Sequence, residues 1–460
     1  MPKKFFKPAW LLAVLIIIVA FAGWMQIHSS AISRGETGDG IKNHPMNTDS
    51  NKDDSNTNEG ISKEDVSNIE KVATPYDGVF SNQGYLAYVQ AGRLYVLDGE
   101  TGTTKKLSHS GLAQCPQWSY DGQWLAYVQT EAESDIAGSL WLVKRDGSKA
   151  LQVQGLPEEV MPFACVWSPV ENQLAVSCQG LWLVSIENKA TQIVKDTEIT
   201  PWLAWSSDGQ KLAYSATLSY RPEEVQNRSD ALFTFDLAAN KTQQHLVSEA
   251  AGIEPVAWWP NGKGILYRED PGHSASIAAD GLELCSYRLG GQETYRFSAA
   301  LTYPQWTVLA SDGKVLRAAG DGREIWTNKW LELGDIYNGK VQRLNLPAGI
   351  VPADPAFSPD QSQIAFVAAP DLGSGVYPGA DEFEQWKGSR RLWTSNLDGS
   401  GAASLSQAGV NIQKPQWSGD GEYILYISDS SLWMITAAGV NPQKLADTVS
   451  DYAWFRSARH

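Results

Sequence analysis

The sequence predicts an all-β fold, namely a β-propeller of four-stranded antiparallel blades. The first observation is a phrase, PQWSYDGQWLAYV at 116–128, that returns in similar form several times along the chain. The second is the pattern after Pro75, where short alternating apolar runs are separated by Gly, Asp and Asn at a spacing that suits strands and turns. The third is that the last repeat ends after its first strand.

The N-terminal segment is expected to enter a membrane. A run without charge extends from Ala9 to Ile27 and follows three lysines, Lys3, Lys4 and Lys7. As a helix this run would span about 28 Å, close to the thickness of a bilayer core. We expect residues 1–28 to be a single-pass anchor in the cell membrane, with the N-terminus in the cytoplasm and the rest outside. The alternative is a signal peptide cleaved near SSAIS, which would leave a secreted protein.

Residues 29–75 are predicted to be a disordered polar linker. No aromatic residue occurs between Ser29 and Thr74, and the stretch NTDSNKDDSNTNEG contains hardly an apolar side chain. Such a segment cannot bury enough surface to offset its conformational entropy. Its expected function is to give the anchored domain reach.

Residues 76–460 are expected to form the propeller. The aromatic residue of the repeated phrase recurs at intervals of 37 to 60 residues, a range typical of four-stranded blades with variable loops. Its positions are Phe80, Trp118, Trp167, Trp205, Trp258, Trp306, Phe357, Trp417 and Trp454. In each unit this aromatic should end a first strand, an Asp-Gly or Asn-Gly pair should make the turn, and an LAY-like run should form the second strand.

Aromatic residues also mark the third strand of most units. Twelve of the nineteen tryptophans fall at these two repeated places, including Trp141, Trp182, Trp330, Trp393 and Trp433 in third strands. Aromatic residues at fixed repeat positions are expected to pack in the core between sheets. No segment of useful length has a helical period.

The end of the chain predicts how the ring closes. SDYAWFRSARH supplies a first strand through Trp454, and the missing second, third and fourth strands are found near the start of the domain in GYLAYV, RLYVLD and TKKLS. Joining the C-terminal strand to these N-terminal strands would remove exposed sheet edges. Counting second strands gives eight blades. Seven is the alternative, because the unit around Trp306 is irregular.

The repeated phrase resembles the TolB-like family of bacterial β-propellers, whose WD-like repeat carries PxWSPDGxxLAY. Residues 116–127 and 415–426 match that phrase best, and the resemblance extends from about residue 76 to the end. It implies the propeller fold, whereas propellers of this kind serve many functions. VWSPVENQLAV departs from the phrase because it lacks the Asp-Gly turn, and PQWTVLASDG departs from it because the turn is displaced.

Composition excludes some classes of partner. The net charge of -15 would repel a phosphate backbone, so nucleic acid is not an expected partner. The four cysteines contain no CxxC pair and no zinc-site spacing. Cys165 and Cys178 flank a predicted hairpin; they could form a disulfide outside the cytoplasm or be two small buried apolar residues.

No motif predicts catalysis, a metal or a cofactor. The nearest string to GxSxG is GHSAS at Gly272, in a loop, and no segment is long enough for a hydrolase module. The histidines are scattered without HxxxH spacing. The Asp-Gly turns lack the dense oxygen-ligand spacing of an EF-hand and are expected to be solvated turns.

The long insertions between second and third strands are the expected binding region. Four units carry them, and equivalent loops of a propeller emerge on one face. These loops mix aromatic and charged residues, as interaction patches do. The candidate binding residues are Tyr220, Arg221, Arg228, His273, Tyr377, Phe383 and Trp386. The alternative is that these residues only cover the mouth of the channel.

The predicted function is that of a non-catalytic scaffold outside the cytoplasm that binds a protein or a cell-envelope component. The alternative is an enzyme that acts on an envelope polysaccharide or peptide at the mouth of the channel. Acidic residues available for that chemistry are Glu223, Glu224, Asp381, Glu382 and Glu384.

Overall fold

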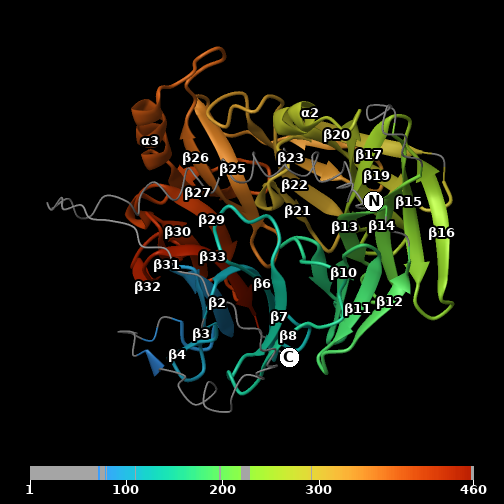
Figure 1. Ribbon diagram of the computed structural model, residues 1–460. Coiled ribbons are helices and arrows are strands. Elements are labelled where there is room, and N and C mark those ends of the chain that lie inside the picture. The colour runs from blue at the N-terminus through green and yellow to red at the C-terminus, as the bar shows by residue number, and fades with distance from the viewer. Residues whose placement is uncertain are drawn as a thin grey trace, which may run out of the picture.

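Eight antiparallel sheets are arranged around a ring in the computed structural model (Figure 1). It describes residues 71–72, 78, 80–108, 110–195, 198–218, 228–291 and 293–456. The predicted all-β propeller of eight blades is confirmed, and the seven-bladed alternative is wrong. The predicted anchor, residues 1–28, and nearly all of the predicted linker lie outside the described residues. Within the described ranges, no helix has the length and apolar character needed to cross a bilayer.

Blades are numbered I to VIII, and their strands are given from the ring axis outward. Blade I consists of β33 (Val449–Phe455), β2 (Tyr85–Gln90), β3 (Arg93–Asp98) and β4 (Thr103–Lys106), with β1 (Lys71–Val72) added at its outer edge. Blade II consists of β5 (Leu112–Trp118), β6 (Trp124–Thr130), β7 (Ser139–Lys144) and β8 (Ala150–Gln152). Blade III consists of β9 (Cys165–Trp167), β10 (Gln173–Ser177), β11 (Leu181–Ser185) and β12 (Ala190–Val194). Blade IV consists of β13 (Ile199–Trp205), β14 (Lys211–Thr217), β15 (Asp230–Asp236) and β16 (Lys241–Val247).

The second half of the ring follows the same order. Blade V consists of β17 (Ala251–Trp258), β18 (Gly264–Pro271), β19 (Leu282–Arg288) and β20 (Thr294–Ala300). Blade VI begins with a 3-10 turn, η2 (Pro304–Trp306), and continues with β21 (Thr307–Leu309), β22 (Lys314–Ala319), β23 (Trp330–Asp335) and β24 (Val341–Arg343). Blade VII consists of β25 (Ile350–Phe357), β26 (Gln363–Pro370), β27 (Arg391–Asn396) and β28 (Ala403–Ser404). After η3 (Ser406–Ala408), blade VIII consists of β29 (Ile412–Trp417), β30 (Tyr423–Ser428), β31 (Ser431–Thr436) and β32 (Gln443–Ala446).

The C-terminal strand closes the ring as predicted. β33 pairs antiparallel with β2, so that Leu86 faces Trp454 and Ala87 faces Ala453. One detail of the prediction is wrong: Phe80 does not end a first strand. It lies in a turn before β2 and its ring packs against that of Trp454, with 5.8 Å between centroids. Because β33 supplies the first strand of blade I, no strand is needed at Phe80.

The turn between first and second strands explains the repeated Ser-x-Asp-Gly letters. In blade II the Ser119 hydroxyl donates to Asp121 Oδ1 at 2.8 Å, and the same carboxylate accepts the backbone N–H of Gln123 at 2.9 Å. Gly122 follows with a φ of +64°, a conformation that glycine adopts readily. The hydroxyl–carboxylate bond recurs between Ser206 and Asp208 and in two further blades, at Ser358–Asp360 and Ser418–Asp420. These carboxylates therefore already accept hydrogen bonds from hydroxyl and backbone N–H groups of the protein.

Two short α-helices interrupt the β pattern in the part of the chain that the structure describes, although the sequence predicted none. α2 (Ala275–Asp280) lies in the connection between β18 and β19, and α3 (Ala380–Gly388) in that between β26 and β27. The Ser274 hydroxyl caps α2 by accepting the backbone N–H of Ile277. The side chain of Glu382 caps α3 by accepting the backbone N–H of Gly379 at 2.9 Å. Both helices are too short for their periodicity to stand out in sequence.

We name the two ends of the ring by their connections. The long-loop face carries the connections between second and third strands, among them 272–281, 320–329 and 371–390. The turn face carries the tight turns between first and second strands, among them 119–123, 358–362 and 418–422. Antiparallel pairing puts these two sets at opposite ends of the blades.

The four cysteines are free. Cys165 and Cys178 are both buried in one apolar cluster of blades II and III, each 4 % exposed. Of the two interpretations, the structure therefore supports buried apolar residues and shows no disulfide.

Candidate functional site

The long-loop face of blades V to VII is built from three segments that contact one another. Arg323, in the 320–329 connection, donates from Nε to the Asp280 carboxylate of α2 at 2.7 Å. In the other direction, the indole of Trp326 donates to the backbone oxygen of Val376 at 2.7 Å. We call α2, residues 320–329 and residues 371–390 together the ridge. The 320–329 segment was not recognised in sequence, where the unit around Trp306 is irregular.

A buried lysine fixes the base of the 320–329 segment. Lys329 is 4 % exposed, and its ammonium group donates to the backbone oxygens of Asp321 and Gly322, both at 3.0 Å. Burial lowers the pKa of Lys329 to about 8. The contacts hold the two ends of this loop together, so the middle of the ridge has a defined shape.

Stacked aromatic rings hold α3 against blade VII. The rings of Phe383 and Trp386 stack at 5.8 Å, and Trp326 meets Phe383 edge-on at 5.6 Å. Trp386 is 5 % exposed and donates its indole N–H to the backbone oxygen of Pro370 at 2.8 Å. Two predicted binding residues, Phe383 and Trp386, are thus mainly anchors of the ridge.

Tyr377 differs from those two residues. It is 74 % exposed and is the most exposed of the large apolar and aromatic side chains among the described residues. Its neighbour Val376 is 43 % exposed, while the backbone oxygen of Val376 is held by Trp326. An exposed aromatic side chain therefore projects from a segment whose backbone is fixed.

Arg228 and His273 come together, but below the surface. The His273 ring has Nε2 at 3.1 Å from the backbone oxygen of Arg228 and at 3.7 Å from the Asp230 carboxylate. Arg228 is 6 % exposed, and the His273 side chain 9 %. Burial lowers the pKa of His273, although Asp230 opposes this. Tyr220 and Arg221 lie outside the described residues, so their place in the predicted patch stays a prediction.

Acidic residues are buried beside that pair. Glu254 lies 3.8 Å from Arg268, and burial raises the pKa of Glu254 to about 7. Asp270 accepts the backbone N–H of Ser274 at 3.1 Å, and burial, helped by the charge of Glu254, raises its pKa to about 7. These groups support the α2 end of the ridge from inside the blades.

Two of the three described acids that were proposed for enzymatic chemistry have structural contacts, and the third, Asp381, is exposed in the first turn of α3. Glu382 caps α3, and Glu384 pairs with Lys387 at 2.7 Å. Glu223 and Glu224 lie outside the described residues.

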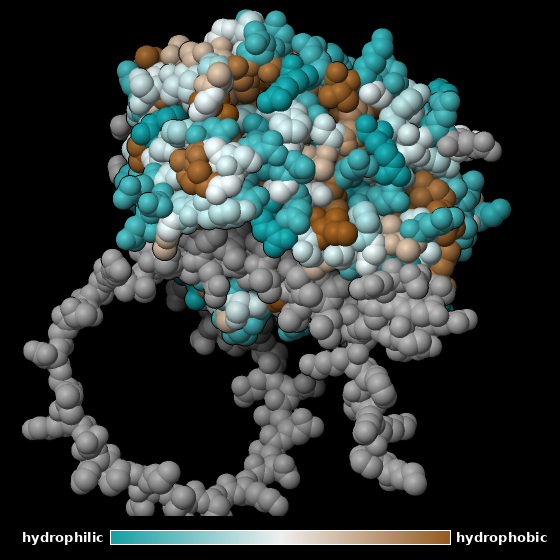
Figure 2. Space-filling view, turned by 90° about the horizontal axis from the view of Figure 1, so that it is seen from above, coloured by the Kyte–Doolittle hydropathy of each residue, from teal (hydrophilic) through white to brown (hydrophobic). Residues whose placement is uncertain are grey.

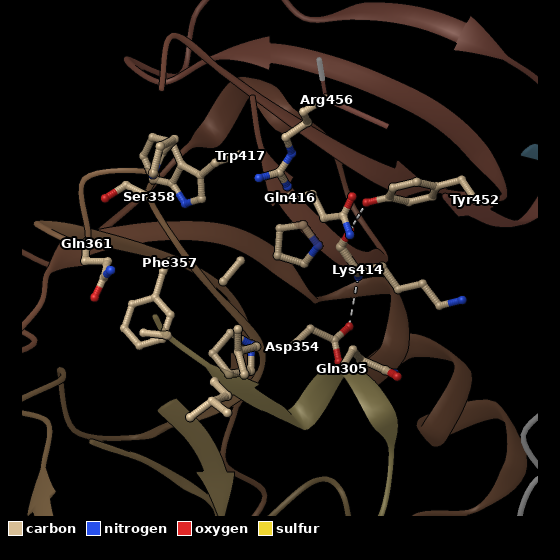
Figure 3. A pocket seen from close by; sticks show the side chains of 17 residues that line it. Gln305, Asp354, Phe357, Ser358, Gln361, Lys414, Gln416, Trp417, Tyr452 and Arg456 are labelled. Atoms are coloured by element: carbon tan, nitrogen blue, oxygen red, sulfur yellow. Dashed lines mark hydrogen bonds between the residues drawn. The ribbon is translucent and has the colours of Figure 1, made fainter. Parts of the chain in front are cut away.

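A cavity of about 400 Å³ lies between the innermost strands of four adjacent blades (Figure 3). It is lined from η2 and β21 of blade VI, β25 of blade VII, β29 of blade VIII and β33 of blade I, so it opens on the channel at the ring axis. Residues of the 358–362 turn line one end, so it reaches toward the turn face. We call it the channel pocket. Sequence analysis did not find this site.

Each repeated proline in blades II, VII and VIII follows a residue at a bulge, and two of these residues, Asp354 and Lys414, line the channel pocket. Cys115, Asp354 and Lys414 each precede the proline of the phrase, and each has a φ of +48° to +49° at a bulge in the first strand. Burial and the Asp451 carboxylate raise the pKa of the Cys115 thiol to about 12. In the sequence, the residue that precedes each repeated proline was the feature that could have indicated this site.

The charges in the channel pocket are partly paired within the protein. Lys414 donates from Nζ to Asp451 at 2.6 Å and from its backbone N–H to Asp354 at 2.9 Å. Burial opposes the charged form of Lys414, but the Asp451 carboxylate outweighs this and raises its pKa. The Tyr452 hydroxyl donates to the backbone oxygen of Lys414 (Figure 3). Arg456 is exposed and lies over the Trp454 ring at 5.3 Å.

Comparisons with known proteins identify the fold. No protein-family model matches the chain, and no curated protein matches its sequence. Among solved structures, dipeptidyl peptidase 4 from Porphyromonas gingivalis matches with a TM-score of 0.55 at 11 % identity, over 83 % of this chain and 60 % of the peptidase. TolB from Acinetobacter baumannii matches with a TM-score of 0.36 at 16 % identity, over 74 % of this chain and 67 % of TolB. Oligogalacturonate lyase from Vibrio parahaemolyticus matches with a TM-score of 0.40 at 14 % identity, over 79 % of this chain and 85 % of the lyase.

At these identities the similarity shows a shared propeller fold and nothing about activity. The chain spans only 60 % of the length of the peptidase, the match with the highest of these three TM-scores. A shared fold does not determine function, so a functional proposal has to rest on the arrangement of the residues in this chain.

Proposed function

We propose that this chain is a non-catalytic binding scaffold, held at the outer side of the cell membrane by residues 1–28, that binds a protein or a cell-envelope component through the ridge. The observation that carries the proposal is the exposure of Tyr377, at 74 %, on a segment whose backbone is held by Trp326. The phrases at 116–127 and 415–426 support a relationship to TolB-like propellers.

The physical reason is pre-organisation. An aromatic side chain supplies a large contact area with few rotatable bonds, and a fixed backbone reduces the entropy lost on binding. Figure 2 views the side on which α2 and α3 lie in Figure 1, and there the apolar residues form separate patches among polar ones. Such a surface suits recognition by an aromatic anchor with a polar rim rather than by a large apolar area.

The test is capture of partners from an envelope extract by the full-length chain and by a Tyr377→Ser variant. The matched control is Tyr120→Ser, because Tyr120 is 57 % exposed but lies on the turn face. We expect a retained partner to be lost with Tyr377→Ser and kept with Tyr120→Ser. Equal retention by both variants would contradict a binding site on the ridge.

The enzymatic alternative has its own test. Purified full-length protein would be incubated with envelope glycans and peptides, and products would be followed by mass spectrometry. The contacts of Glu382 with a helix cap and of Glu384 with Lys387 favour no turnover. Turnover that is lost on substitution of Asp381, Glu382 or Glu384 would replace the scaffold proposal.

The membrane proposal is tested separately by fractionation and by protease treatment of intact cells. We expect the propeller to stay with the membrane fraction and to be cleaved from outside. Protection of the propeller in intact cells would contradict the proposed orientation.

A further inference from the structure

Indole hydrogen bonds connect consecutive blades in one part of the ring. Each first-strand tryptophan of blades II to V donates its Nε1–H to a backbone oxygen of the preceding blade, at the residue just before that blade's own aromatic. The bonds are Trp118 to Ala453 at 2.9 Å, Trp167 to Gln117 at 3.2 Å, Trp205 to Val166 at 3.0 Å and Trp258 to Ala204 at 3.0 Å. We call these four bonds indole staples.

The equivalent bond is missing between blades VII and VIII. By the same rule Trp417 would donate to Ala356, the residue before Phe357. Instead Trp417 Nε1 has no hydrogen-bond partner, although this side chain is only 1 % exposed. Both Trp417 and Ala356 line the channel pocket. A buried donor without a partner costs free energy, so a group that accepts this bond would be favoured here.

Other polar atoms of the channel pocket also lack protein partners. Within the described part of the chain, Gln416 Oε1 and Gln361 Oε1 are buried without a hydrogen bond. The guanidinium of Arg456 forms no ion pair with any described carboxylate. Lys414 and Asp354, by contrast, already contact Asp451 and each other. Arg456 is therefore the cation of this pocket best placed to pair with an anion from outside.

The volume and the lining residues of the channel pocket limit which ligands it can bind. A volume of about 400 Å³ suits a small molecule rather than a folded partner. Phe357 and Pro415 provide apolar surface, whereas the indole N–H of Trp417 and the two amide oxygens require polar groups on the ligand. Guanidinium groups bind carboxylates well because two N–H donors match two oxygens.

We propose that the channel pocket binds a small organic carboxylate that also carries hydroxyl or amide groups. Arg456 pairs with the carboxylate, Trp417 donates to a second oxygen, and Gln416 and Gln361 accept from hydroxyl or amide hydrogens. Sugar acids and N-acylated amino acids share this chemistry. The site is independent of the ridge, because it lies toward the turn face, and its test does not depend on a partner for Tyr377.

The experiment uses full-length protein labelled with ¹⁵N in tryptophan, in which the Trp417→Phe spectrum assigns the Trp417 indole resonance. The probes are D-glucuronate and N-acetyl-L-alanine, and their neutral controls are methyl β-D-glucopyranoside and N-acetyl-L-alanine amide. We expect at least one carboxylate to shift the Trp417 resonance in a saturable way while its neutral control does not. The carboxylate that binds identifies the source of the ligand.

Variants connect the binding to named groups. Arg456→Gln should weaken binding on the order of tenfold or more, because it removes a charge-assisted bond. Arg343→Gln is the matched control: Arg343 lies over the Trp330 ring at 4.8 Å, but on the outermost strand of blade VI, and binding should stay within about twofold. The proposal is overturned if neither carboxylate shifts the resonance, if the neutral controls bind as well, or if Arg456→Gln binds normally.

Discussion

Blades I to V and blades VI to VIII share one repeat but meet their neighbours differently. In the first arc, four consecutive interfaces carry an indole staple. In the second arc, blade VI begins with η2, blade VII has Phe357 where an indole would stand, and Trp417 of blade VIII has no acceptor. The channel pocket lies along this second arc. The repeat therefore determines the blade, whereas the contacts between particular residues of two blades determine whether their interface is closed.

Two groups of charges show a further difference between positions in the ring. Blade V buries Glu254, Asp270 and His273 beneath the α2 end of the ridge. Where blade VIII meets blade I, the Lys414–Asp451 pair is partly exposed, and Arg456, which also lines the channel pocket, is exposed. The charges beneath α2 therefore affect stability, whereas the Arg456 guanidinium is available to a ligand.

The largest effect is expected when the ring is opened between blades VIII and I, where the two arcs meet. Truncation after Asp447 removes β33, which supplies both the partner of β2 and the acceptor for the Trp118 staple. Burial of Val449 and Tyr452 is worth roughly 1.5 to 3 kcal/mol each and every lost backbone bond about 1 kcal/mol, so the sum is comparable to the whole stability of a typical domain. We expect no cooperative urea unfolding by tryptophan fluorescence. The control, truncation after Arg456, keeps β33 and should unfold cooperatively.

A cooperative transition in the chain truncated after Asp447 would show that the ring does not need its closing strand. The blades would then fold as an open array, and the two arcs would differ without being parts of a closed ring.

The next effect concerns pH and the buried acids of blade V. Burial, Glu254 and Asp230 raise the folded-state pKa of Asp270 to about 7, against the smaller opposing effects of the Ser274 N–H and Arg228. The unfolded chain releases this proton first, near pH 4, so stability should fall as pH rises from about 4 to about 7. Asp270→Asn removes this loss, and its side-chain oxygen can still accept the Ser274 N–H.

Compared with the wild type, Asp270→Asn should thus be more stable at pH 8 by roughly 4 kcal/mol and nearly equal at pH 4. Urea unfolding at both pH values measures the difference. A difference that does not change with pH would mean that Asp270 is already ionised in the folded protein.

A smaller effect separates a stapled tryptophan from an unstapled one. Trp258→Phe removes the bond to Ala204 and leaves its oxygen without that donor, whereas Trp417→Phe removes no protein hydrogen bond. Both side chains are at least 95 % buried, so the loss of apolar contact is similar. The free energy of unfolding should fall by about 1 kcal/mol more for Trp258→Phe. Equal losses for the two variants would indicate that the staples contribute nothing to stability.

The smallest effect is expected on the surface. Tyr377→Ser and Tyr120→Ser should each change the free energy of unfolding by less than about 0.5 kcal/mol, because both side chains are mostly exposed. Thermal unfolding at one pH measures this. A large loss for Tyr377→Ser would mean that it supports the ridge rather than extends from it.

Much of the fold was predictable because the signals are local. The Ser-x-Asp-Gly turn, the first-strand tryptophans and the short last repeat together predict eight blades and closure by Trp454. The error at Phe80 arose because an aromatic six or so residues before a second strand looks the same in a turn as in a strand. Only the pairing of β33 with β2 distinguishes the two.

The site was less predictable because exposure is a property of the whole fold. Arg228, Phe383 and Trp386 are in connections between strands, where sequence suggests exposure, yet Arg228 and Trp386 are buried and Phe383 stacks on Trp386 and meets Trp326 edge-on. Tyr377 alone of the described candidates is mostly exposed. No sequence motif marks the channel pocket. Its unpaired donor depends on whether Trp417 bonds to blade VII, and the repeated phrase does not reveal this.

Hydrogen exchange of the indole N–H groups tests the difference between the two arcs most directly. In ligand-free protein at neutral pH, Trp258 should exchange slowly, since its N–H is bonded to Ala204. Trp417 should exchange markedly faster and should slow when a carboxylate ligand is added. Exchange of Trp417 as slow as that of Trp258 without ligand would contradict the account, because the interface between blades VII and VIII would then be as closed as the others.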